Sequence, residues 1–208
     1  MKKDSYNLNG IKYVVTGLAL MAIATMAIEA LNLWKQIDIA SIVDIGVILL
    51  SFLFMLLGTI RLAHYRSEYR KAMILSAIGA GATLLELVLV LIDIKKGAEG
   101  VFQGIEVMFM AYIGTLAMLG VFYFVIRGNA QLLAKHGEIK LAKKSLRVNK
   151  MATIVILITL LVIPGAYVFP LIVKYVLAGL GIAGSVFVKM YMCNIIDRGY
   201  KILHGRRG

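Results

Sequence analysis

Long apolar runs that follow one another along the chain are the feature that most constrains its fold. Residues 11–33, 72–93 and 101–126 are each mainly apolar over more than the roughly 18 residues that a helix needs to cross a bilayer. Hydrophobic residues make up 61% of the 208-residue sequence, more than a soluble domain of this size uses. Because a backbone inside lipid must satisfy its own hydrogen bonds, the sequence predicts an all-α membrane protein.

The polar breaks between these runs predict six transmembrane helices within a single domain that covers residues 1–208. The long apolar stretch near the C-terminus is divided at Pro164, Gly165 and Pro170, which favour a turn. The first apolar run is too long for a signal peptide, so it is expected to remain as the first helix. The expected spans are residues 11–33, 40–63, 72–93, 101–126, 151–167 and 170–194.

The distribution of basic residues predicts the orientation of this bundle. The net charge is +12, and the N-terminal segment, residues 61–71, residues 127–150 and the C-terminal tail carry most of the lysines and arginines. Six spans place these segments on one side, so the positive-inside rule predicts that both termini are cytoplasmic. Anionic headgroups explain the charge better than nucleic acid does. The compact basic loops, and the lack of export or organelle signals, favour a bacterial cytoplasmic membrane.

Residues 127–150 form the one long polar segment between the expected spans. Leu132, Ile139 and Leu146 recur every seven residues within it, among several basic side chains. This pattern predicts a basic amphipathic helix on the cytoplasmic surface, or a helical extension of the preceding span. The residues expected to contact lipid headgroups or a partner protein are Lys140, Lys143, Lys144 and Arg147.

The span at residues 72–93 is expected to be the central helix of the bundle. Small residues fill its first half on almost every face, which lets neighbouring helices approach closely. Glu86 lies deep in its second half, where a carboxylate costs about 2–3 kcal/mol even on an insertion scale. Such a residue is expected either to serve a function or to form a structural hydrogen bond between helices.

Other acidic residues fall at a similar level of the predicted topology, in the outer half of the first four spans. If these side chains converge, they form an outward-opening anionic pocket for a metal cation, an ammonium group or protons. Alternatively, all but Glu86 reach water near a span end or pair with nearby lysines. Lys174 and Lys189, in the last apolar stretch, are expected to extend toward the membrane surface. The candidate ligands are Glu29, Asp44, Thr83, Glu86, Asp93 and Glu106.

The sequence favours a protein of the transport class, either a transporter subunit or a channel, without a cofactor. It contains no HExxH, GxSxG, Walker A, EF-hand or CxxC pattern, so an intramembrane enzyme ranks third. The alternative is a non-catalytic accessory, immunity or defence protein that acts through helix–helix and cytoplasmic contacts. In either class, the chain is expected to form a homo-oligomer or to belong to a membrane complex, with no nucleic acid bound. The identity of any metal remains open.

Overall fold

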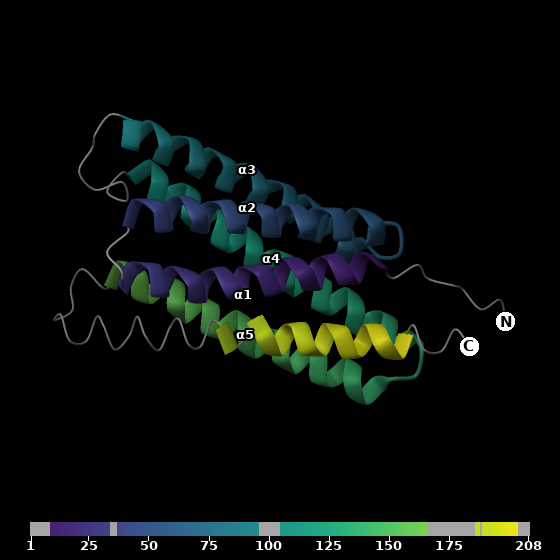
Figure 1. Ribbon diagram of the computed structural model, residues 1–208. Helices are drawn as coiled ribbons and strands as arrows, with labels where there is room; N and C mark the ends of the chain where they lie inside the picture. Colours follow the sequence, from purple (N-terminus) through teal and green to yellow (C-terminus); the bar gives the residue numbers. More distant parts are fainter. Residues whose placement is uncertain (1–8, 34–36, 96–104, 166–185, 188, 204–208) are drawn as a thin grey trace.

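The structure, a computed structural model, is a bundle of long helices that run back and forth (Figure 1). It describes residues 9–33, 37–95, 105–165, 186–187 and 189–203, without the side chains of 24–33, 37–41, 93–95, 105, 107–108 and 155–165. The labelled helices are α1 (Asn9–Leu33), α2 (Ile37–Leu62), α3 (Ser67–Lys95), α4 (Ile105–Lys135) and α5 (Ile139–Gly165). Residues 189–203 form a further helix, called the C-terminal helix below and drawn in yellow in Figure 1.

Three helices have the length and apolar composition of membrane spans. The stretches within the described residues are Ile42–Leu62, Ser67–Ile92 and Phe109–Lys135, and α1 adds a shorter apolar stretch, Asn9–Ile23. The prediction of an all-α protein is therefore confirmed for the described residues, and three of these helices are long and apolar enough to span a membrane. The count of six spans stays a prediction, because residues 166–185, where the last division was placed, lie outside the described residues.

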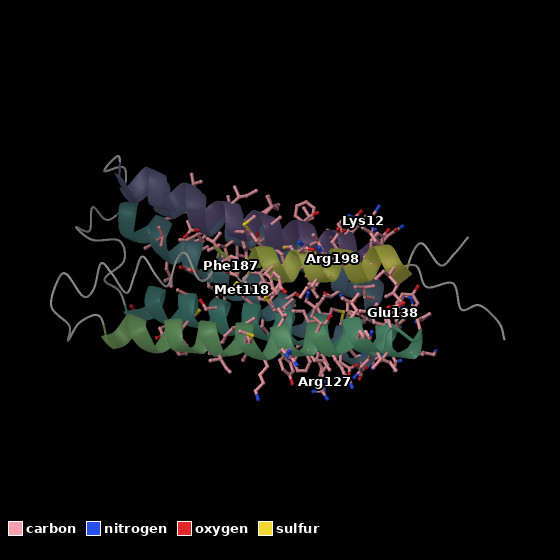
Figure 2. All side chains as sticks on the ribbon, turned by 90° about the horizontal axis from the view of Figure 1, so that it is seen from below. Lys12, Met118, Arg127, Glu138, Phe187 and Arg198 are labelled. Atoms are coloured by element: carbon pink, nitrogen blue, oxygen red, sulfur yellow. The ribbon has the colours of Figure 1, made fainter. Side chains whose placement is uncertain are left out.

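Successive helices pack against one another, and the C-terminal helix closes the bundle between α1 and α5 (Figures 1 and 2). The Tyr200 hydroxyl donates a hydrogen bond to Asn9 Oδ1 at 3.4 Å, and the Lys12 ammonium lies 5.5 Å above the Tyr200 ring. The start of α1 and the end of the C-terminal helix therefore lie at one end of the bundle. The α2–α3 and α4–α5 turns share this end, called the basic end below.

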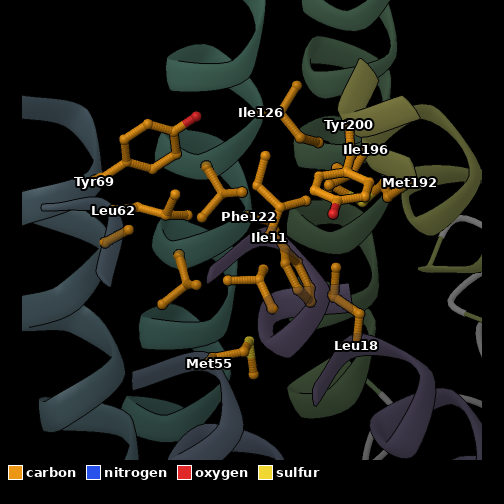
Figure 3. Packing of buried hydrophobic residues seen from close by; sticks show 14 of the residues in the cluster. Ile11, Leu18, Met55, Leu62, Tyr69, Phe122, Ile126, Met192, Ile196 and Tyr200 are labelled. Carbon is orange, nitrogen blue, oxygen red and sulfur yellow. The ribbon is translucent and has the colours of Figure 1, made fainter. Parts of the chain in front are cut away.

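The apolar core lies between α1, α2, α4 and the C-terminal helix (Figure 3). Each contributes side chains that are at most 1% exposed, including Leu18, Met55, Phe122 and Met192. Hydrophobic burial of this kind is the main term that holds helices together where water is present, and close packing adds to it in lipid.

The expectation that residues 72–93 form the central helix is wrong, because α3 lies at an edge of the bundle. Among α1 to α5, its contacts are with α2 and α4, while Ala77, Ile78 and Gly81 are exposed. Small residues permit close approach on any face, but only one face is used. There Gly79 leaves room for the ring of Phe52, which a Cβ atom would overlap.

Three glycines and a serine form a close seam between α1 and α2. A Cβ atom added at Gly58 would lie 2.5 Å from the Gly10 carbonyl oxygen, and one added at Gly17 would lie 2.6 Å from the Ser51 carbonyl oxygen. Asp44, Ser51 and Gly58 recur every seven residues, so all three lie on the same face of α2. This face is the one that packs on α1.

The α4–α5 turn replaces the expected surface helix at residues 127–150. Gly137 adopts a left-handed conformation with φ of 84° and ends α4. The Glu138 amide donates to the Leu133 carbonyl at 2.9 Å, and the Gly137 amide donates to the Ala134 carbonyl at 3.1 Å, the pattern of a Schellman motif. The surface-helix interpretation is therefore wrong, and the segment extends α4 and begins α5.

The same turn explains why the seven-residue repeat in this segment does not form one face. Leu132 belongs to α4 and is fully buried, whereas Ile139 and Leu146 belong to α5 and are exposed. The buried face of α5 instead carries Ala142 and Ser145. A repeat that crosses a turn loses its helical phase, so its spacing no longer predicts a shared face.

Replacing Gly137 by alanine is expected to destabilise the protein by about 1 kcal/mol, because a side chain in the left-handed region meets the following carbonyl. Thermal unfolding of the detergent-purified protein measures this loss. Gly137→Asn should lose less, since asparagine tolerates this conformation better than alanine does. An alanine variant as stable as the wild type would show that the turn does not limit stability.

Candidate functional site

Three ionisable side chains from distant parts of the sequence lie inside the bundle, where Asp44 is within electrostatic range of both Glu86 and Lys189. Glu86 on α3 is 9% exposed and Lys189 on the C-terminal helix is 7% exposed, while Asp44 on α2 is partly buried. The charge of Asp44 acts on Glu86, and the charges of Asp44 and Lys189 act on each other. We call these three residues the charged cluster.

Packing at the start of α2 and the end of α3 positions the two acids. Ile45 and Val90 are both buried and form a small apolar cluster between the two helices. Asp44 adjoins Ile45 in the sequence, and Glu86 precedes Val90 by one helical turn. The antiparallel packing of α2 on α3 therefore draws these carboxylates to a similar level, in the half of the bundle away from the basic end.

The C-terminal helix supplies the opposite charge. This helix runs antiparallel to α1, because Tyr200 contacts Asn9 and the Cys193 thiol lies 4.0 Å from the Val15 carbonyl oxygen. Lys189 lies one turn beyond Cys193, further from the basic end. From the C-terminal helix, the charge of Lys189 acts on Asp44 of α2.

Thr83 is the neutral polar residue nearest to Glu86 along α3, one turn away on the same face. It is 1% exposed, and a Cβ atom on Gly114 of α4 would lie 3.5 Å from its hydroxyl oxygen. Thr83 therefore faces α4. By contrast, the Ser51 and Ser76 hydroxyls donate to carbonyls of their own helices at 2.7 and 2.9 Å.

The structure places the other predicted pocket residues differently or leaves them undescribed. Glu106 lies at the start of α4 with an exposed side chain. The side chains of Glu29 and Asp93 lie outside the described residues. Of the predicted acids, only Asp44 and Glu86 are described within electrostatic range of each other, and convergence of all five stays a prediction.

Lys189 is the member of the cluster that the sequence did not predict. Its position in an apolar run suggested a side chain that extends toward the membrane surface, but it is almost fully buried. The available signal was an isolated cation in an apolar helix together with acids in others, because buried charges are normally paired. Sequence spacing alone does not show which helix provides the partner.

A second polar layer lies nearer the basic end and was also not predicted. The Tyr69 hydroxyl on α3 donates to Asn129 Oδ1 on α4 at 2.5 Å, and Asn149 Nδ2 on α5 donates to the Tyr123 carbonyl at 3.2 Å. Among the described residues, Asn129 Nδ2 and Asn149 Oδ1 are buried without a hydrogen-bond partner. These bonds connect α3, α4 and α5, which is a structural role.

The chemistry of the charged cluster suits a proton or a small cation, because its two carboxyl groups outnumber its one amino group. No group of three or more His, Cys, Asp or Glu side chains that could hold a metal occurs among the described residues.

The basic residues predicted to bind lipid or a partner all lie on the first turns of α5. Lys140, Lys143, Lys144 and Arg147 are exposed. They lie at the basic end, together with Lys12, Arg198 and the α4–α5 turn. Figure 2 labels Lys12, Arg198 and, in this turn, Glu138.

Comparison of the chain with protein family models, with curated proteins and with solved structures finds no match. Function is therefore inferred from the residues of the chain itself.

Proposed function

We propose that this chain is a small multi-pass membrane protein of the transport class, a transporter subunit or channel, rather than an enzyme. The observation that carries the proposal is the charged cluster: Glu86 and Lys189 are buried on two helices, and Asp44 on a third helix lies within electrostatic range of both. Ionisable residues within membrane segments are costly, and they commonly mark ion or substrate pathways.

The charge balance of the cluster defines the class of ligand. The positive charge of Lys189 offsets the negative charge of Asp44, so the cluster supplies no second cation for the Glu86 carboxylate. An uncompensated charge is costly there, because the bundle interior has a low dielectric constant. A proton or a cationic solute at Glu86 neutralises it. Movement of the Lys189 ammonium away from Asp44 would open a second site for a cation, which gives the cluster two states.

The proposal includes the topology expected from the sequence. Six spans with both termini cytoplasmic place the basic end at the inner face, against anionic headgroups of a bacterial cytoplasmic membrane. Asp44 and Glu86 lie in the opposite half, so the site opens outward. Lipid covers part of the apolar outer faces of α2 and α3. Further copies of the chain, or other subunits of a larger membrane complex, would cover the rest.

Replacing Glu86 by glutamine is expected to abolish cation binding while leaving the fold intact, because the change removes only the charge. Thermal stability of the detergent-purified protein is measured with metal cations, polyamines and cationic metabolites. A ligand at 100 times its dissociation constant stabilises the folded state by about 2.7 kcal/mol. Glu68→Gln, the same change in the first turn of α3 at the basic end, is the matched control.

A cation that stabilises the wild type and Glu68→Gln but not Glu86→Gln supports the transport class. Uptake of that cation into proteoliposomes should be retained in Glu68→Gln and lost in Glu86→Gln. Equal shifts in all three proteins would place the binding site elsewhere and remove the basis of the proposal.

The alternative is a non-catalytic accessory, immunity or defence protein that acts through helix–helix and cytoplasmic contacts. The exposed cations of α5 favour this class, since they form a continuous surface beyond the apolar part of the bundle. Loss of function on neutralising Lys140, Lys143, Lys144 and Arg147, with Glu86→Gln silent, would support it.

A further inference from the structure

An open cleft of about 450 Å³ lies at the basic end, between the start of α5 and the C-terminal helix. The two helices are more than 50 residues apart in the sequence, and each contributes two cations. These are Lys140 and Lys144 from α5, and Arg198 and Lys201 from the C-terminal helix. We call this site the basic cleft.

The spacing of these cations directs them into the cleft. Lys140 and Lys144 are four residues apart on α5, and Arg198 and Lys201 are three apart on their helix, so each pair shares one helical face. Like charges at these spacings repel one another and slightly destabilise a helix. Two such faces opposite each other increase that repulsion, which an anion between them would relieve.

Acidic residues balance only part of this charge. Glu138 is the one carboxylate in the cleft lining, against the four cations. Asp197 forms an ion pair with Lys201 at 2.7 Å, which occupies that lysine. Lys140, Lys144 and Arg198 are then the cations that face an incoming ligand, and a guanidinium with two lysines is a combination suited to phosphate.

Apolar side chains lie beside these charges. Leu141 and Ile202 line the same cleft and are partly buried. A free inorganic anion would gain nothing from them, whereas an amphiphile would. The cleft therefore fits a ligand that carries a phosphate group next to a hydrocarbon part.

The depth of the cleft agrees with such a ligand. Met151, which is exposed, begins the apolar part of α5, and Lys144 precedes it by seven residues. Seven residues of helix span about 10 Å, so Lys144 lies near the level of the lipid headgroups if the apolar part of α5 lies in the membrane.

We propose that the basic cleft is a binding site for one anionic phospholipid. Lys140, Lys144 and Arg198 bind its phosphate group, and Leu141 and Ile202 contact the adjoining glycerol and acyl atoms. The bound lipid holds the C-terminal helix against α5. This site is separate from the charged cluster and does not depend on the function proposed for it.

The test compares two variants of the full chain with the same change in net charge. The cleft variant carries Lys140→Gln, Lys144→Gln and Arg198→Gln. The control variant carries Arg70→Gln, Lys71→Gln and Lys150→Gln, three exposed cations that do not line the cleft and have no predicted role in binding. Thermal stability is measured in detergent against phosphatidylglycerol, phosphatidylcholine and inorganic phosphate, and native mass spectrometry counts the phosphatidylglycerol molecules bound.

Phosphatidylglycerol is expected to stabilise the wild type and the control variant, with one lipid retained. The cleft variant should need at least tenfold more lipid for half of the same shift. Phosphatidylcholine and inorganic phosphate should have little effect on any of them. Should the cleft variant fail to fold, Arg198→Gln against Arg70→Gln gives the same comparison with one substitution each.

Two results would overturn the proposal. Equal loss in both variants would mean that lipid binds to the diffuse charge of the basic end. An equal shift from inorganic phosphate would mean that the cleft holds a free anion and that the apolar side chains contribute nothing.

Discussion

Gly58→Ala is expected to destabilise the protein by about 2 kcal/mol, which is within the range for overpacked sites. The same substitution at Gly46, on the same helix, is not expected to destabilise it. A Cβ atom at Gly58 would lie 2.5 Å from the Gly10 carbonyl oxygen and 3.0 Å from the Val14 amide nitrogen. Both obstacles are backbone atoms, which no rotamer change can move. The helices α1 and α2 must therefore separate, and the contacts along their seam weaken.

The control at Gly46 isolates this steric effect from helix propensity. No atom lies within 4 Å of a Cβ added there. Alanine is favoured over glycine by about 1 kcal/mol in a helix interior, so propensity acts in the stabilising direction at both positions. Unfolding of both variants in detergent measures the difference. Equal stabilities would mean that the seam relaxes without loss and does not hold α1 to α2.

The hydropathy of the chain was sufficient to predict the first three helices. The expected spans at 11–33, 40–63 and 72–93 correspond to Asn9–Leu33, Ile37–Leu62 and Ser67–Lys95. Length and apolar composition determine such segments directly, since a helix is the only open chain conformation that satisfies its backbone in lipid.

The same signal failed where a helix continues beyond its apolar part. The span expected to end at residue 126 continues to Lys135, because Ala130, Leu132 and Leu133 are buried against other helices. Polar residues on the opposite side lower the hydropathy of this part without interrupting the helix. Its end depends on Gly137, whose left-handed conformation is a local property that hydropathy does not measure.

The charged cluster was predicted only in part, for a related reason. The depth of Glu86 in an apolar run was visible in the sequence, and the burial of its side chain agrees with that depth. Which helices surround it was not visible, because small residues on every face of α3 left its neighbours undetermined. Lys189 comes from a helix more than 100 residues away, and only tertiary packing identifies its partner.

Lys189→Met is expected to destabilise the protein by about 3 kcal/mol, because it leaves the Asp44 carboxylate without its cation. This value is at the lower end of the range for breaking a buried charge pair, since Asp44 is only partly buried. Methionine keeps the apolar stem and removes the charge. Asp44 then lies beside Glu86 without the ammonium group that balances it. Lys201→Met on the same helix is the control, since the Lys201 side chain is 73% exposed and pairs with Asp197 at the surface. Such exposed pairs contribute about 0–1 kcal/mol.

Adding Asp44→Asn to Lys189→Met should restore most of the lost stability, because the pair is then removed together rather than broken. The four unfolding free energies of this double-mutant cycle give the coupling between the two residues. A coupling near zero, or a Lys189→Met variant as stable as Lys201→Met, would show that the two charges do not support each other. The restored double variant keeps Glu86, so its response to cations separates the two possible roles of the pair. Retained binding would assign the ligand to Glu86 alone, whereas lost binding in a stable protein would make Asp44 or Lys189 part of the site.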